Sequence, residues 1–279
     1  MSVVKISAKE VAQLRAKTGA GMMDCKKALV EAEGDFQKAI ENLRKKGQKV
    51  AANRGDREAS EGVIIGNVNA DNTAGAIIAL NCETDFVAKN SDFIAVAQRI
   101  LDVAMANNPA DLDALKALEY GEGMTIADKV IEQTGVIGEK IEVNNYSPLS
   151  GEGVVIYNHP GYRLSTGVVI NKNNEAAIEA GKEVAMQIAS NNPVALDKSG
   201  IAPEVLAKEQ EIGKDLAIKE GKPAEMAEKI SIGRVNKFIK ENTLLSQTYF
   251  SDSKKSVQDY LTSVEAGLTV TSFVRANLD

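Results

Sequence analysis

Side chains suited to catalysis and metal binding are scarce in this sequence. The 279 residues include one histidine, two cysteines and no tryptophan, and aromatic residues make up only 4% of the chain. One histidine cannot build a multi-histidine metal site or provide both halves of a histidine-based acid–base pair. Cys25 and Cys82 lie far apart and do not form the disulfide framework of a small secreted protein. These absences exclude several classes of enzyme and metalloprotein and favour a protein that acts through its shape.

Long apolar runs and nucleotide-binding motifs are also missing. No stretch of about 18 apolar residues occurs, so we expect no transmembrane helix. The N-terminus has neither the apolar core of a signal peptide nor an arginine-rich transit character, which predicts a cytoplasmic protein. Neither a G-x-x-x-x-G-K-[ST] loop nor a strand-borne G-x-G-x-x-G is present, so we expect no direct nucleotide binding. Glu83 and Asp85 have no further oxygen ligands clustered around them for a metal site.

The charge balance argues against a DNA-binding protein. Thirty-nine acidic residues outnumber 33 basic ones, which gives a formal net charge of −6, whereas phosphate contacts require a basic surface. One run, residues 44–57, contains six basic residues and a single aspartate. Two interpretations remain open for it: a solvated helix end and linker, or the arm of an RNA-associated adaptor. The absence of interleaved aromatic residues for base stacking weakens the second interpretation.

The first 55 residues are predicted to form a bundle of three short helices that ends in the basic linker. A capping box at Ser7–Glu10 begins the first helix, and Gly19 and Gly21 break the chain after it. Asp24 is expected to cap the second helix, and Gly34–Asp35 separates it from the third. The third helix has one apolar face, formed by Phe36, Ala39, Ile40 and Leu43.

Beyond residue 60 the sequence contains an internal repeat. Two short apolar runs of strand type precede a helical segment that ends in Asn-Asn-Pro, and this order occurs twice. The matching pairs are Gly62–Ile65 with Gly153–Ile156, Gly75–Ile78 with Gly167–Ile170, and Asn107–Pro109 with Asn191–Pro193. We therefore predict an α+β fold, in which the N-terminal bundle (1–55) is followed by two antiparallel β-β-α-α-β subdomains (56–148 and 149–279).

Each copy of the repeat carries its own insertion. Matching positions of the two copies are 92 residues apart at the second strand but only 84 residues apart at Asn-Asn-Pro. The first copy therefore has eight additional residues between these points, near Asn81–Ala88. The second copy has 47 additional residues after Pro193, which indicate a helical hairpin at about 200–242 with arms Pro203–Lys219 and Pro223–Lys240. Its large apolar residues include Val205, Leu206, Ile212, Leu216, Met226, Ile230, Val235 and Phe238. Either the two arms bury these residues against each other, or the hairpin is a dimerisation element.

Two residues of the first insertion are open to opposite interpretations. A nucleophilic Cys82 would need a histidine, and His159 is the only one, so the alternatives are a thiol enzyme and a small buried cysteine. Phe86 follows the acidic Asp85. This phenylalanine either packs in the core or is an aromatic anchor that a partner's pocket receives.

Two longer segments resemble the signatures of a known family. Leu14–Arg15 together with Thr18–Leu29 is similar to the N-terminal signature of the translation elongation factor Ts family, and Asn81–Ala88 resembles its second signature. The resemblance covers essentially the whole chain and includes the hairpin of the long bacterial form. It implies a ubiquitin-associated-like N-terminal bundle, a homodimer formed through the hairpin, and a C-terminal segment that docks on the partner.

The resemblance also implies a function. It implies a guanine-nucleotide exchange factor that binds elongation factor Tu with GDP, dislodges the magnesium ion of that GTPase and promotes GDP release during translation elongation. The loop residues implied in this step are Thr84, Asp85, Phe86 and Val87, with Phe86 as a wedge between partner helices and Asp85 as its charged tip. The N-terminal residues implied in partner binding are Leu14, Arg15, Gly19, Gly21, Met22 and Met23. Since metal and nucleotide belong to the partner, we expect a protein that is not an enzyme and needs no catalytic residue, metal or cofactor of its own.

Overall fold

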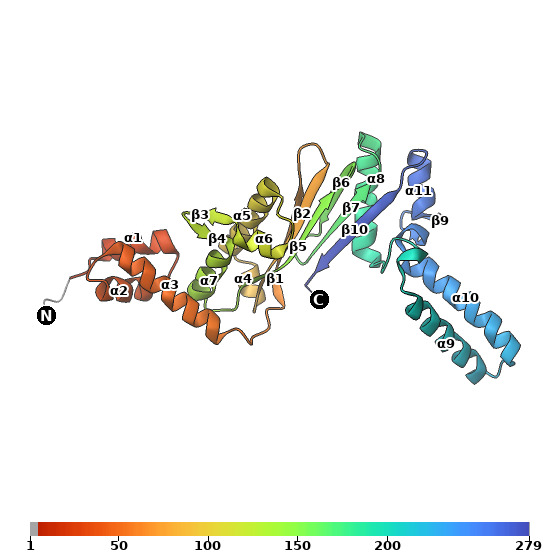
Figure 1. The fold of residues 1–279 in the computed structure, drawn as a ribbon, viewed down its shortest axis with the longest axis horizontal. Helices are drawn as coiled ribbons and strands as arrows, with labels where there is room; N and C mark the ends of the chain where they lie inside the picture. Colours follow the sequence, from red (N-terminus) through yellow and green to blue (C-terminus); the bar gives the residue numbers. More distant parts are fainter. Residues whose placement is uncertain (1–4, 279) are drawn as a thin grey trace. The chain divides into compact units, whose positions relative to one another are not determined.

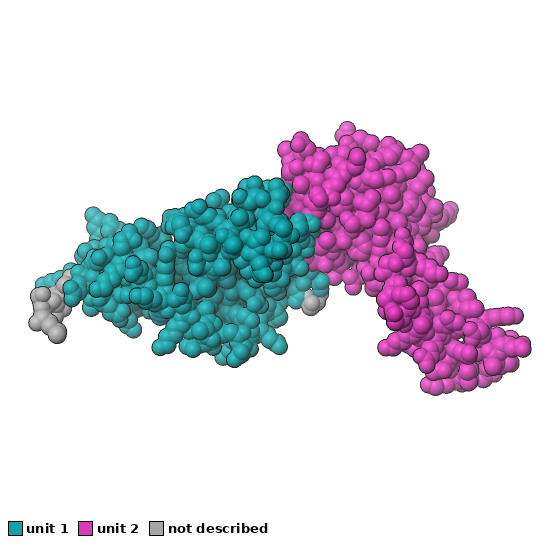
Figure 2. Space-filling view, in the orientation of Figure 1, with its two compact units in different colours: residues 1–65, 77–148, 277–279 teal, residues 66–76, 149–276 magenta. Residues whose placement is uncertain are grey.

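The structure, a computed structural model, describes residues 5–278 and has an α+β fold in which helices accompany small β-sheets (Figure 1). The α+β class expected from the sequence is therefore confirmed. Two compact units can be distinguished (Figure 2). The first unit comprises the described residues of 1–65, 77–148 and 277–279, and the second unit comprises 66–76 and 149–276.

Three helices at the N-terminus enclose a small apolar core: α1 (Ala8–Thr18), α2 (Met22–Glu31) and α3 (Phe36–Asn53). The expected capping box is present, because the side chains of Ser7 and Glu10 each accept a hydrogen bond from the other residue's backbone N–H. We call these three helices the bundle.

The start of α2 differs from the prediction. Asp24 does not cap this helix, because Gly21 already occupies the cap position and α2 begins directly after it, at Met22. Asp24 falls in the first turn instead, where a carboxylate is favoured by the helix dipole, and forms an ion pair with Lys46 of α3. Gly19 ends α1 in the left-handed conformation, with φ 70°, which allows the chain to turn sharply between the two helices.

Helix α3 runs through most of the basic segment, since it ends at Asn53. Two of the basic side chains are held by acidic partners within the protein: Lys46 pairs with Asp24, and Arg54 donates to Glu83 at 2.7 Å. The segment is thus a solvated helix face whose end is attached to the rest of the first unit. This arrangement favours the interpretation as a helix end and linker over that of an RNA-binding arm.

A three-stranded sheet in the order β1-β2-β5 follows the bundle. The elements in this part of the chain are β1 (Glu61–Val68), β2 (Ala74–Cys82), α4 (Asp85–Ala88), α5 (Ser91–Asn107), α6 (Leu112–Ala117), β3 (Glu119–Gly121), β4 (Met124–Thr125), α7 (Ile126–Ile137) and β5 (Glu142–Ser150). Helix α7 packs along α3, and its Val136 contacts the apolar core of the bundle. The bundle is therefore joined to the rest of the first unit through a helix–helix contact as well as through the chain itself.

The second unit contains a three-stranded sheet in the order β10-β7-β6. Strands β6 and β7 are antiparallel, with Gly153 opposite Ile170 and Asn158 opposite Ser165. The elements are β6 (Gly153–Asn158), β7 (Leu164–Ile170), α8 (Glu175–Asn191), η1 (Lys198–Gly200), α9 (Pro203–Lys219), α10 (Ala224–Asn242), η2 (Leu244–Ser246), β8 (Thr248–Tyr249), β9 (Asp252–Ser256), α11 (Val257–Val264) and β10 (Val270–Asn277). The sheet, α8 and α11 contribute residues to one apolar core.

Helix boundaries expected from the repeat occur in both halves of the chain. Helices α5 and α8 both end before a proline at an asparagine in the left-handed conformation, Asn108 with φ 47° and Asn192 with φ 42°. Helices α7 and α11 both begin with a capping box, which Thr125 and Ser256 provide. The same local sequence signals therefore end and begin corresponding helices.

The hairpin formed by α9 and α10 packs in an unexpected way. The buried residues between its arms are small, namely Gly213, Ala217, Ala227 and Ser231. A Cβ atom added to Gly213 would lie only 3.2 Å from the Cα atom of Ser231. Several large apolar side chains remain at the surface, including Val205, Ile212, Leu216 and Met226. The interpretation that the arms bury these four residues against each other is wrong, because the small residues already fill the seam between the arms.

Candidate partner-binding site

The most exposed large apolar side chain lies directly after strand β2. Phe86 belongs to the four-residue helix α4 and is 84% exposed, the highest fraction among the exposed large hydrophobic residues that the structure describes. Its neighbour Val87 is half-buried. The core-packing interpretation of Phe86 is therefore wrong, and the side chain is free to act as an anchor for a partner.

Asp85 stands beside Phe86 as a charged residue. Its carboxylate forms an ion pair with Lys89 one turn later, at 2.6 Å. The hydrogen bond from Lys89 lowers the pKa of Asp85 below its ordinary value, so the carboxylate is ionised at neutral pH. The pair places one negative and one positive charge next to an exposed aromatic ring.

Thr84 connects the exposed turn to the body of the first unit. Its hydroxyl donates a hydrogen bond to Glu139 at 2.7 Å, and its backbone N–H donates to the same carboxylate at 3.0 Å. Of the loop residues predicted from the sequence, Thr84 thus holds the loop, Phe86 is exposed, and Asp85 and Val87 are partly buried. Glu139 was not predicted, because it is 55 positions from Thr84 and belongs to no recognisable motif.

Cys82 does not have the surroundings of a nucleophile. The side chain is fully buried at the end of β2, and its thiol donates to the carbonyl oxygen of Thr84 at 3.2 Å. Burial, with a smaller contribution from Glu139, raises the pKa of Cys82 to about 12, so the thiolate is absent at neutral pH. His159 is engaged elsewhere, since its Nδ1 atom lies 3.0 Å from the hydroxyl oxygen of Tyr157. These observations favour a structural cysteine over a thiol enzyme.

A second exposed apolar surface lies on the bundle. Met22 and Met23, at the start of α2, are 44% and 64% exposed. The predicted residues Arg15, Gly19 and Gly21 are also exposed. Leu14, in contrast, is completely buried in the bundle core and supports this surface from within.

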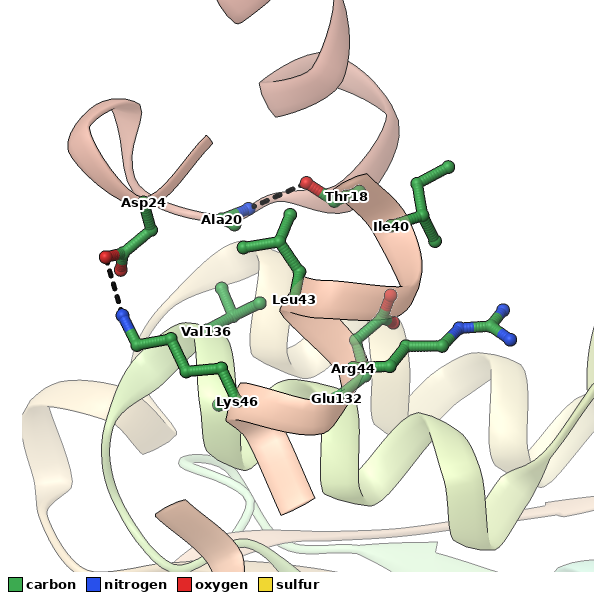
Figure 3. A pocket seen from close by; sticks show the side chains of 10 residues that line it. Thr18, Ala20, Asp24, Ile40, Leu43, Arg44, Lys46, Glu132 and Val136 are labelled. Carbon is green, nitrogen blue, oxygen red and sulfur yellow. Dashed lines mark hydrogen bonds and ion pairs between the residues drawn. The ribbon is translucent and has the colours of Figure 1, made fainter. Parts of the chain in front are cut away.

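A small hollow lies where the bundle meets α7 (Figure 3). Its lining includes Leu43 from α3 and Val136 from α7, and the ion pair between Asp24 and Lys46 is part of the same wall. The cavity measures about 20 Å³, which is room for about one water molecule. It is too small for a nucleotide or a cofactor and is better described as part of the joint between α3 and α7.

The described part of the chain has neither a metal-binding cluster nor a helix that could span a membrane. Residues 5–278 contain no group of three or more His, Cys, Asp and Glu side chains that could hold a metal ion. Within the same range, no helix has both the length and the apolar character needed to cross a membrane.

Comparison with known proteins identifies the family. The family model described as Elongation factor TS matches residues 83–279. Elongation factor Ts from Flavobacterium psychrophilum is 50% identical over 273 residues, which cover 98% of each chain. Elongation factor Ts from Christiangramia forsetii is 51% identical over 99% of this chain and 100% of the relative, and that from Porphyromonas gingivalis is 43% identical over 98% of each.

The chain belongs to the elongation factor Ts family. The resemblance inferred from the two sequence segments is thereby confirmed, and the protein is an elongation factor of protein biosynthesis with exchange-factor function. The family match to elongation factor Ts includes the exposed loop 84–87, and the relatives also include the bundle because they extend over nearly the whole chain. Both exposed surfaces therefore lie in parts of the chain that are similar to elongation factor Ts.

Proposed function

We propose that this protein is a guanine-nucleotide exchange factor that binds elongation factor Tu with GDP and accelerates GDP release during translation elongation. The observation that carries the proposal is the exposure of Phe86, 84% of whose side chain is accessible on a short helix attached to the body of the first unit. Burial of one such side chain in a partner contributes about 1.5–3 kcal/mol. An exposed aromatic side chain on a helix that is held in place has the features of an anchor that a partner's pocket receives.

The proposed mechanism uses Phe86 as a wedge and Asp85 as a charge. Phe86 enters between helices of elongation factor Tu, and Asp85 brings a negative charge close to the magnesium site of that GTPase. Magnesium neutralises the phosphate oxygens of the bound nucleotide, so GDP binds more weakly once the ion is dislodged. The metal and the nucleotide belong to the partner, and the chain itself contributes shape and charge.

Binding is reciprocal in this mechanism. If the protein weakens GDP binding to elongation factor Tu, GDP must weaken the binding of the protein by the same factor. A coupling free energy of about 1–3 kcal/mol corresponds to a change of roughly 5–150-fold in either affinity. The factor therefore leaves its partner when nucleotide binds again.

The bundle provides a second contact in this proposal. Met22 and Met23 form an exposed, flexible apolar surface of the kind that adapts to a partner. We propose that these two methionines, together with Arg15, Gly19 and Gly21, contact the nucleotide-binding domain of elongation factor Tu. Leu14 takes part indirectly, since it is buried in the core of the bundle that presents this surface.

We propose that the hairpin of α9 and α10 mediates self-association of the protein. Val205, Ile212 and Leu216 recur along α9 at intervals of seven and four residues, which places them on one stripe of the helix. All three are exposed. We propose that a second copy of the chain covers this stripe, and that the C-terminal segment docks on elongation factor Tu.

The wedge is tested by stopped-flow measurement of GDP release from elongation factor Tu. Phe86→Ala is expected to lower the acceleration of release by about 10-fold or more, in line with the loss of a central interface anchor worth at least about 2 kcal/mol. Phe250→Ala is the matched control, because Phe250 is also an exposed phenylalanine, 51% accessible, but lies in the second unit. Full acceleration by Phe86→Ala would remove Phe86 from the mechanism.

A further inference from the structure

Behind the exposed loop, one carboxylate holds two successive residues. Glu139 accepts hydrogen bonds from the backbone N–H groups of Glu83 and Thr84, at 3.1 and 3.0 Å, and from the hydroxyl of Thr84, at 2.7 Å. Hydrogen bonds to an ionised acceptor are stronger than those between neutral groups. Glu139 therefore fixes the chain at the position where α4 begins.

A second carboxylate makes the complementary connection. The Oε1 atom of Glu83 accepts from the backbone N–H of Lys140 at 2.6 Å and from Nη1 of Arg54 at 2.7 Å. Lys140 also donates through Nζ to the carbonyl oxygen of Arg57 at 3.0 Å. Residues 83–84 thus donate hydrogen bonds to Glu139, and Lys140 donates one back to Glu83. The hydrogen bond from Arg54 connects Glu83 to the segment that follows α3 as well. We call Glu83 and Glu139 the carboxylate brace.

The brace lies at the ends of α3, the last helix of the bundle, and of α7, the helix that packs along it. Glu139 comes directly after Gly138, the left-handed residue with φ 81° that ends α7. Arg54 is the C-terminal capping residue that directly follows α3. Helices α3 and α7 pack along each other. Glu139 at the end of α7 and Arg54, the partner of Glu83, at the end of α3 therefore belong to one packed pair of helices. The loop that presents Phe86 is thereby fastened to the same helices as the bundle that presents Met22 and Met23.

We infer that Glu83 and Glu139 are positioning residues for Phe86, which hold α4 in place against the ends of α3 and α7. This inference rests on the proposed function, because it assigns the brace to the loop that acts on the partner. A wedge exerts its effect only if it cannot swing away on contact. A preformed loop also binds without the entropy cost of ordering it in the complex.

The brace is tested first on the free protein. Glu139→Gln keeps the size of the side chain and one acceptor oxygen for the two backbone N–H groups, which both donate to Oε2, but it removes the negative charge of the acceptor. We expect the amide hydrogens of Glu83 and Thr84 to exchange with solvent about 10-fold faster, as measured by NMR, because hydrogen bonds to a charged acceptor become weaker bonds between neutral groups. Glu58→Gln, at an exposed position of the same unit, is the matched control and should leave both amides unchanged. Wild-type exchange in Glu139→Gln would overturn the inference.

A pair of variants at Thr84 keeps the test decisive if Glu139→Gln folds poorly. Thr84→Val removes only the hydroxyl that donates to Glu139, whereas Thr84→Ser keeps it. We expect faster amide exchange over residues 83–88 in Thr84→Val and its restoration to the wild-type rate in Thr84→Ser. Equal exchange in both variants would overturn the role of this hydrogen bond and of the brace that contains it.

The functional test separates positioning from affinity. In nucleotide exchange on elongation factor Tu, Glu139→Gln is expected to lower the maximal rate of GDP release by about 10–100-fold, the effect of misplacing an active group by about 1 Å. The half-saturating concentration should change by a smaller factor than the maximal rate, since the contacts proposed for Met22 and Met23 are unaltered. A wild-type maximal rate would overturn the inference. If wild-type protein itself fails to accelerate release, the proposed function fails, and amide exchange in the free protein still decides whether the brace holds the loop.

Discussion

Gly135 of α7 lies against Gly47 of α3 with no side chain between the two backbones. A Cβ atom added to Gly135 would come within 2.5 Å of the Cα atom of Gly47, closer than packed atoms approach. Gly47 is itself buried, and a Cβ atom there would lie 3.3 Å from the carbonyl oxygen of Ile131. The two glycines therefore allow the close helix contact that joins the bundle to the rest of the first unit.

Substitution of Gly135 tests this contact. Gly135→Ala is expected to destabilise the protein by about 1–3 kcal/mol, because backbone atoms must move apart to admit the methyl group. The control is Gly233→Ala in α10, where an added Cβ atom meets nothing within 4 Å. That control should stabilise its helix by about 0.5–1 kcal/mol, since alanine favours helices over glycine. Urea unfolding followed by circular dichroism measures both changes, and equal effects would contradict the steric explanation.

The stability of the brace should depend on pH in the acid range. Hydrogen bonds from the backbone N–H of Lys140 and the guanidinium of Arg54 lower the pKa of Glu83 below its ordinary value of 4.5. Folding therefore favours the charged form of Glu83. The stabilisation that this charge contributes to the folded protein is complete above about pH 4.5, and it is lost as the pH falls through the folded-state pKa of Glu83. We expect Glu83→Gln to be less stable than wild type at pH 7 and the difference to shrink towards pH 3.

The measurement for Glu83 is the urea midpoint of both proteins as a function of pH. Glu58→Gln serves as the control, because Glu58 is exposed and its removal should give a small difference from wild type at every pH. A stability difference between Glu83→Gln and wild type that stays constant from pH 7 to pH 3 would rule out the charge of Glu83 as its source.

Self-association through the hairpin predicts sensitivity to charge on α9. The double substitution Ile212→Lys and Leu216→Lys should weaken the dimer by roughly 3 kcal/mol or more, since each apolar side chain buried in an interface contributes about 1.5–3 kcal/mol. Sedimentation equilibrium measures the association constant. Asn236→Lys, an exposed polar position on α10, adds one positive charge without removing apolar area and should have little effect. A wild-type chain that stays monomeric at high concentration would contradict the assignment.

Cys82 should be inert towards thiol reagents in the folded protein. Burial raises the pKa of Cys82 to about 12, and the thiolate is the reactive form. We expect alkylation at pH 7.5 to proceed only after unfolding, as followed by mass spectrometry. Cys82→Ser keeps a hydroxyl donor for the carbonyl oxygen of Thr84 and is expected to retain GDP-release activity within about twofold, because side-chain hydrogen bonds contribute only about 1 kcal/mol net. Rapid modification of Cys82 in the folded chain would contradict its structural role.

Features that depend on neighbouring residues were predictable from the sequence. The capping box predicted at Ser7 bonds within three residues, and the capping boxes at Thr125 and Ser256 have the same three-residue spacing of side chains. The ends of α5 and α8 follow from the conformational restriction before proline. The prediction for Asp24 failed within this same class, because Gly21 can occupy a cap position without a side chain.

Features that depend on packing between distant segments were not predictable. Glu139 and Thr84 meet only because the end of α7 lies next to the end of β2, and no local pattern encodes that contact. In the hairpin, periodicity locates the apolar stripe on α9 but does not say that Gly213 and Ser231 will face each other. The exposure of Phe86 likewise required the structure, since the residue pattern alone left a place in the core open.

The small-residue seam of the hairpin has a consequence for local unfolding. Gly213, Ala217, Ala227 and Ser231 bury little apolar surface, and burial stabilises by only about 25 cal/mol per Å². The two arms therefore open at a lower free energy than the sheet cores, and their amides exchange before those of β7 or α8. Any molecule that covers the outer face of α9 only when the arms are closed acts against this opening by mass action, so the free energy of opening rises with the logarithm of its concentration once the face is saturated.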